Sequence, residues 1–255
     1  MAPAIVLIGL AIMVLAFIFY KKPKKKVNLP ADFRQQLIHR VAFYRRLNDH
    51  NKIKFEKKIK EFLSYVSIEG VKTKVDDIDR LLVASSAVIP IFRFTNWKYY
   101  NLTNVLLYPD SFNREEFLAH GYERNTLGMV GNGAMQRTMI LSKPALHYGF
   151  ENEESVQNTG IHEFVHLLDK EDGDVDGLPE ALLNRKYNAQ WLELVNKNMD
   201  KILSGYSDIN IYGATNKAEF FAVTSEYFFN NPKLFKENHP ELFDLMVKMY
   251  QVNDN

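Results

Sequence analysis

Two histidines stand four residues apart in the stretch NTGIHEFVHLLDKEDGD, and a glutamate directly follows the first of them. Side chains at positions i and i+4 of a helix lie one above the other, so the imidazoles of His162 and His166 can reach the same metal ion. The side chain of Glu163 is rotated away from that face, beside the ion. Apolar residues recur in the same stretch with helical spacing, at Ile161, Phe164, Val165 and Leu168. The segment is therefore predicted to be an amphipathic helix that packs on one side and presents both histidines on another.

A third metal ligand must come from elsewhere in the chain, because a catalytic zinc site uses three protein ligands and leaves one position open. The continuation found in metzincins would require Gly and His at positions 169 and 172, and both positions are Asp here. The stretch AEFFAVTSEYFF offers Glu219 and Glu226, which are costly to bury unless they are paired or bind a metal. They lie two helical turns apart, about 10.5 Å along the axis, so one ion can take only one of them. Spacing alone does not choose between the two, nor does it exclude an exposed polar stripe.

The composition is that of an ordinary globular protein, in which 46% of the 255 residues are hydrophobic and 25% are charged. This length suffices for one sizeable core or two small ones. The 32 Lys and Arg nearly balance the 31 Asp and Glu, so the net charge of +1 does not indicate nucleic acid as a partner. The chain contains no cysteine, which excludes disulfides, thiolate metal ligands and a cysteine nucleophile, and fits a reducing compartment.

Residues 4–20 form an uncharged, mostly apolar run, AIVLIGLAIMVLAFIFY. A helix of this length spans roughly 25 Å, close to the lower limit for crossing a bilayer. The residues before the run carry no basic charge and the run ends in bulky residues, so a transmembrane anchor is favoured over a cleaved signal peptide. Five lysines within residues 21–26 follow, and positive charge tends to remain cytoplasmic. We therefore expect a single-pass protein of the cell membrane that contacts the lipid bilayer through residues 4–20 and whose globular part faces the cytoplasm.

The segment after the apolar run is predicted to be helical. Residues 21–30 are expected to form a basic linker, and residues 31–90 an N-terminal helical region. Helical spacing of apolar residues predicts two helices up to about residue 68. A third helix is predicted from residue 75 to 91, beginning near a cluster of aspartates and ending at Pro90.

Residues 91–255 are expected to form the second and larger part. Runs of β-branched and aromatic residues predict strands within residues 97–109 and 137–146, with a turn at 128–135 between them. The histidine motif helix is predicted to begin near Asn152 or Ser155. Further helices are predicted at residues 181–203, 216–229 and 239–251. The fold class is therefore α+β, mainly helical with a small sheet before the motif helix.

The motifs IHEFVHLLDKEDGD and AEFFAVTSEYFF together closely resemble the Mlc titration factor A family of zinc peptidases, relatives of the lethal-factor-type gluzincins. The resemblance extends through LLYPDSF and MILS over roughly residues 90–250 and is weak in the N-terminal helices. It implies a zincin-like catalytic domain, a peptide or protein substrate and one Zn²⁺ per chain. It also implies that Glu163 is the general base and that Tyr212 lies over the metal. The metal ligands that it implies are His162, His166 and Glu219.

The chemistry of such a site is hydrolysis of a peptide bond. Zinc lowers the pKa of a bound water toward about 7 and polarises the scissile carbonyl, while Glu163 passes the water proton to the leaving amine. Tyr212 can donate its phenol hydrogen to the oxyanion, or it can be a half-buried packing residue. Asp169 can orient a ligand imidazole, or it can cap the end of its helix. The strand within residues 137–146 can pair with an extended peptide if it lies at a sheet edge.

These expectations combine into a membrane-anchored zinc metallopeptidase of the gluzincin type. The alternative is a membrane-tethered regulatory or binding protein that keeps the zincin fold and sequesters a cytosolic partner. An intact Glu163 beside two histidines favours the enzyme, because a binding protein has no need of a general base. The membrane segment is not part of the soluble family pattern, so the glucose-repressor protein Mlc is not carried over as a partner.

Overall fold

The structure, a computed structural model, describes residues 27–110, 112–113, 125–126, 128–130, 137–151 and 155–251. Within this part of the chain, no helix is long and apolar enough to cross a membrane. The predicted anchor at residues 4–20 and the five lysines after it lie outside the described residues. The transmembrane topology therefore stays a prediction.

Helices dominate the described residues and a small sheet accompanies them, which confirms the α+β class. The helices before the histidine motif are α2 (Phe33–Arg40), α3 (Ala42–Arg45), α4 (Asp49–Tyr65), α5 (Asp77–Ile91) and α6 (Lys143–Glu151). The strands are β1 (Ser67–Gly70), β2 (Asn104–Tyr108), β3 (Phe112–Asn113), β4 (Asn125–Thr126), β5 (Gly128–Val130) and β6 (Thr138–Ser142). The motif helix and those after it are α7 (Thr159–Asp169), η3 (Lys170–Asp172), η4 (Arg185–Tyr187), α8 (Asn188–Leu203), η5 (Ile211–Ala214), α9 (Lys217–Asn230), α10 (Pro232–Asn238) and α11 (Pro240–Met249).

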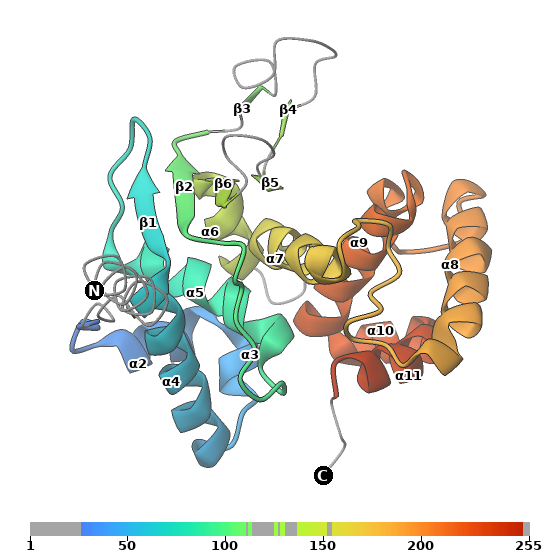
Figure 1. Ribbon diagram of the computed structural model, residues 1–255, viewed down its shortest axis with the longest axis horizontal. Coiled ribbons are helices and arrows are strands. Elements are labelled where there is room, and N and C mark those ends of the chain that lie inside the picture. The colour runs from blue at the N-terminus through green and yellow to red at the C-terminus, as the bar shows by residue number, and fades with distance from the viewer. Residues whose placement is uncertain are drawn as a thin grey trace, which may run out of the picture.

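The main sheet has the strand order β1-β2-β6-β5. Its first three strands are parallel, with Ile68 opposite Val105 and Val105 opposite Met139, whereas β5 pairs antiparallel with β6. Parallel neighbours need a crossover connection, and α5 lies in the one between β1 and β2. Helix α7 contacts β5 and β6 and lies centrally, between the sheet and helices α8 and α9 (Figure 1). The sheet thus supports the motif helix from one side.

The two helices predicted up to residue 68 are in fact three helices followed by a strand. Val41 has extended backbone angles (φ −106°, ψ 94°), which separate α2 from α3. Asn48 then caps α4 by accepting a hydrogen bond from the backbone N–H of Asn51. The sequence does not reveal β1, because Ile68 is the single buried residue among its four and the run is too short for a strand pattern. The helix predicted at 75–91 is confirmed as α5.

Both predicted strands are confirmed, as β2 and β6. The turn predicted between them at residues 128–135 is wrong in part. Residues 128–130 of the segment 128–135 form strand β5, which is hydrogen-bonded to β6. A run of three residues is too short to show an alternating pattern, so pairing with a partner strand decides its conformation. As a result β6 lies between β2 and β5, and it is not the edge strand that substrate pairing would need.

The strand predicted over 137–146 ends at Ser142, and the chain turns there into helix α6. The hydroxyl oxygen of Ser142 accepts a hydrogen bond from the backbone N–H of Ala145 at 3.3 Å. Pro144 suits the first turn of a helix, because its missing N–H would have no helical partner there. Ser142 and Pro144 therefore favour a helix start, and the strand ends earlier than the apolar run predicts.

Helix α7 begins at Thr159, later than the predicted start near Asn152 or Ser155. Asn158 is its N-cap, since its side-chain oxygen accepts a hydrogen bond from the backbone N–H of Ile161 at 3.0 Å. Helix α8 likewise begins at Asn188, after a short 3-10 turn, and not at residue 181. The helices predicted at 216–229 and 239–251 are confirmed as α9 and α11.

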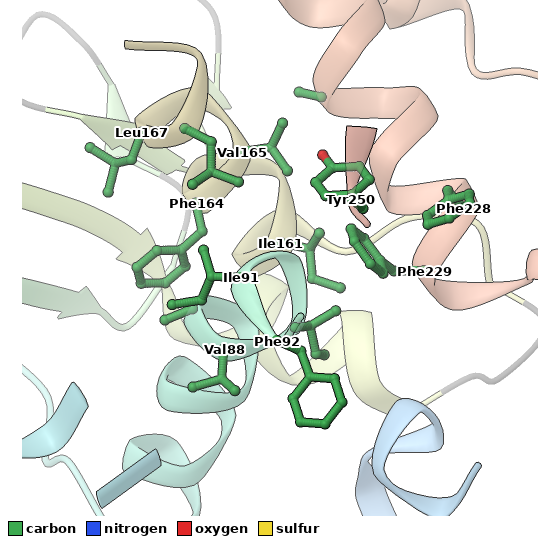
Figure 2. Close-up of a cluster of buried hydrophobic side chains, with 14 of the residues drawn as sticks. Val88, Ile91, Phe92, Ile161, Phe164, Val165, Leu167, Phe228, Phe229 and Tyr250 are labelled. Atoms are coloured by element: carbon green, nitrogen blue, oxygen red, sulfur yellow. The ribbon is translucent and has the colours of Figure 1, made fainter. Parts of the chain in front are cut away.

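The apolar stripe of α7 lies in the middle of the hydrophobic core. All four of its predicted residues, Ile161, Phe164, Val165 and Leu168, are 0% exposed. Figure 2 shows three of them, Ile161, Phe164 and Val165, between the end of α5 and the C-terminal helices, with Val88, Ile91 and Phe92 on one side and Phe228, Phe229 and Tyr250 on the other. Full burial of such a side chain contributes about 1.5–3 kcal/mol. The core thus fixes the rotation of α7, and with it the face on which the histidines lie.

Candidate metal centre

Helix α7 brings His162 and His166 together as their spacing predicts. Their ring centroids are 4.7 Å apart with an interplanar angle of 82°, and the two Nε2 atoms are 3.1 Å apart. His162 is only 8% exposed. The two imidazoles therefore present one nitrogen each to a shared, largely desolvated position.

Helix α9 adds Glu219 to this pair. Asn216 caps α9 by accepting a hydrogen bond from the backbone N–H of Glu219 at 2.9 Å, which places the carboxylate in the first turn. Its Oε2 lies 3.0 Å from Nε2 of His162 and 3.3 Å from Nε2 of His166. Tetrahedral zinc with bonds of 2.0–2.1 Å separates its ligand atoms by about 3.3 Å. The donor types and their separations thus fit a zinc ion.

Glu226 lies outside the cluster of three donor atoms and contacts the other ring nitrogen of His162. Its Oε1 lies 2.7 Å from Nδ1 of His162, and its Oε2 accepts a hydrogen bond from the backbone N–H of Asn158. A carboxylate at Nδ1 keeps the proton on that nitrogen and leaves Nε2 free to bind a metal. Spacing on α9 leaves Glu219 and Glu226 as alternative third ligands. In the fold, Glu219 lies beside both Nε2 atoms, whereas Glu226 lies at Nδ1 of His162. The apolar neighbours of Glu226 are the sequence signal that it is buried and paired.

Asp169 contacts the loop that follows its helix. Its Oδ2 accepts a hydrogen bond from the backbone N–H of Gly177 at 2.9 Å. Gly177 has a positive φ of 76°, and Asp169 itself is fully buried at the end of α7. This contact ties the end of the helix to the loop that follows it.

Carboxylates outnumber imidazoles among the side chains of the site. Burial raises the pKa of Glu219, but hydrogen bonds to His162 and His166 outweigh it and hold the pKa far below its ordinary value. Burial lowers the pKa of His162, but the carboxylates of Glu226 and Glu219 raise it well above its ordinary value. Imidazoles lower the pKa of Glu219 and carboxylates raise that of His162, and the three carboxylates of Glu163, Glu219 and Glu226 exceed the two imidazoles in number. A divalent cation would neutralise that excess.

Glu163 lies in the same region and is 6% exposed. Burial raises the pKa of its carboxyl group, while His162 and His166 oppose this effect. A general base works best when its pKa is raised toward the operating pH. The surroundings of Glu163 therefore suit proton transfer.

Tyr212 lies on η5, in the chain segment between α8 and α9. Asn210 caps this short helix by accepting a hydrogen bond from the backbone N–H of Tyr212 at 2.9 Å. The Tyr212 ring centroid is 5.9 Å from that of His162, and the residue is 44% exposed. Tyr212 is therefore at the open side of the site and not buried in the core. All five predicted site residues, from α7, η5 and α9, meet in one place.

The chain is similar to a known family of metallopeptidases. A family model described as glucose-regulated metallo-peptidase M90 matches residues 19–251. The chain belongs to this family. The match covers most of the chain and includes the N-terminal helices as well as both motifs.

Several relatives in this family carry the name that the two motifs suggest. Mlc titration factor A of Cronobacter sakazakii is 26% identical over 223 residues, 80% of each chain. A protein of the same name from Escherichia fergusonii is 36% identical over 104 residues, 38% of each chain. An uncharacterised protein of Synechocystis sp. is 29% identical over 232 residues, which are 87% of this chain and 84% of the relative. The resemblance inferred from the sequence is thereby confirmed.

Proposed function

We propose that this M90 family member is a zinc-dependent peptidase of the gluzincin type. The observation that carries the proposal is the approach of three donor atoms from two helices to within 3.3 Å of one another, with a buried glutamate beside them. In this proposal His162, His166 and Glu219 hold the ion. Zinc bound there would polarise the carbonyl of the scissile peptide and lower the pKa of water.

The remaining residues would handle protons and orientation. Glu163 accepts a proton from the attacking water and delivers it to the leaving amine. Tyr212 donates its phenol hydrogen to the carbonyl oxygen as negative charge develops there. Glu226 accepts the Nδ1 hydrogen of His162 and so fixes the tautomer and the ring plane. Each role corresponds to a contact or to a position beside the donor atoms.

The substrate in this proposal is an extended peptide. Within the described sheet, β1 and β5 are the edge strands, and β5 lies against α7. A peptide that pairs with a sheet edge gains main-chain hydrogen bonds without a specific sequence. Pairing at β5 would place a peptide next to the helix that carries both histidines.

The membrane location belongs to the proposal as well. The apolar run at residues 4–20 followed by five lysines supports a single-pass anchor with the peptidase on the cytoplasmic side. The name of the relatives describes titration of Mlc by those proteins. A binding function of that kind in this chain would leave Glu163 without a task, so hydrolysis is the function that we favour.

A comparison of two proteins tests the proposed function. The full chain in detergent and its Glu163→Gln variant are purified, analysed for zinc and incubated with a library of peptides. We expect equal zinc content and a loss of cleavage of at least 100-fold in the variant, because the base is removed and no ligand changes. Equal cleavage by both proteins, or zinc lost from the variant, would contradict the assignment of Glu163.

A further inference from the structure

A carboxylate outside the metal centre collects three side-chain hydrogen bonds at the start of the segment that carries Tyr212. Oδ2 of Asp208 accepts hydrogen bonds from Oη of Tyr227 at 2.5 Å and from Nδ2 of Asn238 at 2.7 Å. Oδ1 of Asp208 lies 2.6 Å from Nε2 of His239. These donors come from α9, from the end of α10 and from the residue that precedes α11. One side chain therefore joins the loop after α8 to the C-terminal helices.

The network lies at the edge of the core, where two buried donors meet a carboxylate whose side chain is 41% exposed. Tyr227 is 1% exposed and His239 is 9% exposed. Burial raises the pKa of Asp208, but hydrogen bonds from Tyr227, His239 and Asn238 outweigh it and lower the pKa below its ordinary value. Hydrogen bonds to an ionised carboxylate are stronger than those between neutral groups. The loop is therefore held firmly at Asp208.

The chain from Asp208 to Tyr212 is short and internally bonded. Ile209 is 3% exposed and anchors the loop in the core. Asn210 accepts hydrogen bonds from two successive backbone N–H groups, with its side chain from Tyr212 and with its carbonyl oxygen from Gly213, both at 2.9 Å. A displacement of Asp208 would therefore also displace Tyr212, because the segment between them is short and held by its own hydrogen bonds.

Helix α9 receives this segment on the same side as the metal ligand. A Cβ added at Gly213 would lie 3.4 Å from Cβ of Val223, so η5 packs closely on α9. Glu219, Val223 and Tyr227 follow one another at intervals of four residues and lie along one side of the helix. Tyr227 is about 12 Å along the axis from Glu219, so the network does not touch the metal ligands.

We propose that Asp208 is a positioning residue, which fixes the segment from Asp208 to Ala214 on α9 so that Tyr212 stays beside His162. Because Tyr212 is 44% exposed, burial alone does not fix its ring, and the placement of its backbone contributes to where its hydroxyl lies. The consequence for catalysis rests on the proposed function. Loss of the anchor should lower kcat more than it raises KM, since a donor to the oxyanion acts mainly in the transition state.

The test uses two tyrosines in similar surroundings. Tyr227→Phe removes one hydrogen bond to Asp208 and keeps the ring. Tyr44→Phe is the matched control, because Tyr44 is 2% exposed and its hydroxyl donates to Oε1 of Glu56 at 2.7 Å, on the N-terminal helices. Backbone hydrogen exchange of Tyr212 and Gly213 is measured in the full chain in detergent, together with melting temperature, zinc content, kcat and KM.

We expect both variants to lose thermal stability to a similar extent and to keep their zinc. Tyr227→Phe alone should speed exchange at Tyr212 and Gly213 roughly tenfold, as expected when one hydrogen bond to a charged group no longer opposes local opening. It alone should also lower kcat. Asn238→Ala, which removes an exposed donor and spares the core, should change exchange in the same direction by a smaller factor.

Two results would overturn the proposal. One is unchanged exchange at Tyr212 and Gly213 in both Tyr227→Phe and Asn238→Ala. The other is equal acceleration in Tyr227→Phe and in Tyr44→Phe, which would make the effect one of global stability. A wild-type chain that binds zinc but cleaves no peptide would contradict the proposed function alone, because the exchange rates still decide whether Asp208 anchors the segment.

Discussion

The two glutamates of α9 provide a direct test of which residue binds the metal and which supports a ligand. Glu219→Gln replaces an anionic oxygen that lies within 3.3 Å of both histidine Nε2 atoms by a neutral amide. Changes to residues that only support a ligand typically cost 10–100-fold in metal affinity. Loss of a ligand should cost more, so we expect zinc affinity to fall by more than about 100-fold.

Glu226→Gln should mainly reduce stability. An amide can still accept the Nδ1 hydrogen of His162 through its oxygen, but its NH₂ group then faces the backbone N–H of Asn158. A buried donor left without an acceptor costs about 1–3 kcal/mol. The unfolding free energy measured in the presence of a chelator should fall by about that amount. Zinc affinity should drop by about tenfold, the low end of the range for a supporting residue, so saturating zinc still fills the site.

The assay is competition for zinc against a chelating indicator, combined with urea unfolding of the metal-free chain. Glu56→Gln is a suitable control, because Glu56 is also 6% exposed and accepts hydrogen bonds from Tyr44 and Arg34, far from the metal ligands in the chain. It should lose stability and keep the wild-type zinc affinity. A larger loss of zinc affinity in Glu226→Gln than in Glu219→Gln would refute this assignment of the two glutamates.

Three further outcomes can be checked. Tyr212→Phe should lower kcat by roughly 10–100-fold with little change in KM, and an unchanged turnover rate would return Tyr212 to a packing role. Burial raises the pKa of Asp79, but hydrogen bonds from His147, Lys143 and the amide of Asp76 lower it below its usual value of 3.8. Its stabilising contribution is therefore complete above the unfolded pKa and is lost as the pH falls through the lower folded pKa. Urea unfolding below about pH 4 should show a smaller pH dependence in Asp79→Asn, and an identical dependence would contradict this. A reporter fused to the C-terminus should behave as cytoplasmic, whereas export of the reporter would reverse the predicted topology.

The motif helix could be predicted from the sequence because all of its determinants are local. The spacing of His162 and His166 and the apolar stripe on the opposite side lie within a few turns, where helical periodicity is a sufficient guide. The same holds for α9 and for the capping box of α5, in which Asp76 and Asp79 each accept the other's backbone N–H. Local patterns are therefore sufficient to predict that these helices exist, although not where α7 begins.

The features that could not be predicted depend on partners distant in the chain. Strand β5 exists because residues 128–130 pair with β6, and their own sequence indicates a turn. Glu226 and His162 are 64 residues apart in the chain, so the spacing of residues on α9 cannot show that Glu226 contacts Nδ1 of His162. The anchoring of the Tyr212 segment by Asp208 likewise needs donors from three elements. Family resemblance can indicate a ligand, but it does not show how the fold holds that ligand in place.

The proposed metal ligands come from two helices, and His162 and Glu219 are 57 residues apart in the chain. A complete ligand set thus exists only while α7 and α9 are packed together, so an ion that binds it selects the folded chain. By mass action such an ion adds about 2.7 kcal/mol to stability at a free concentration one hundred times its Kd. The amount of folded protein in a cell would then follow the free zinc concentration, and zinc starvation would lower it through proteolysis of unfolded chains. A melting temperature that does not rise with buffered free zinc would exclude this dependence.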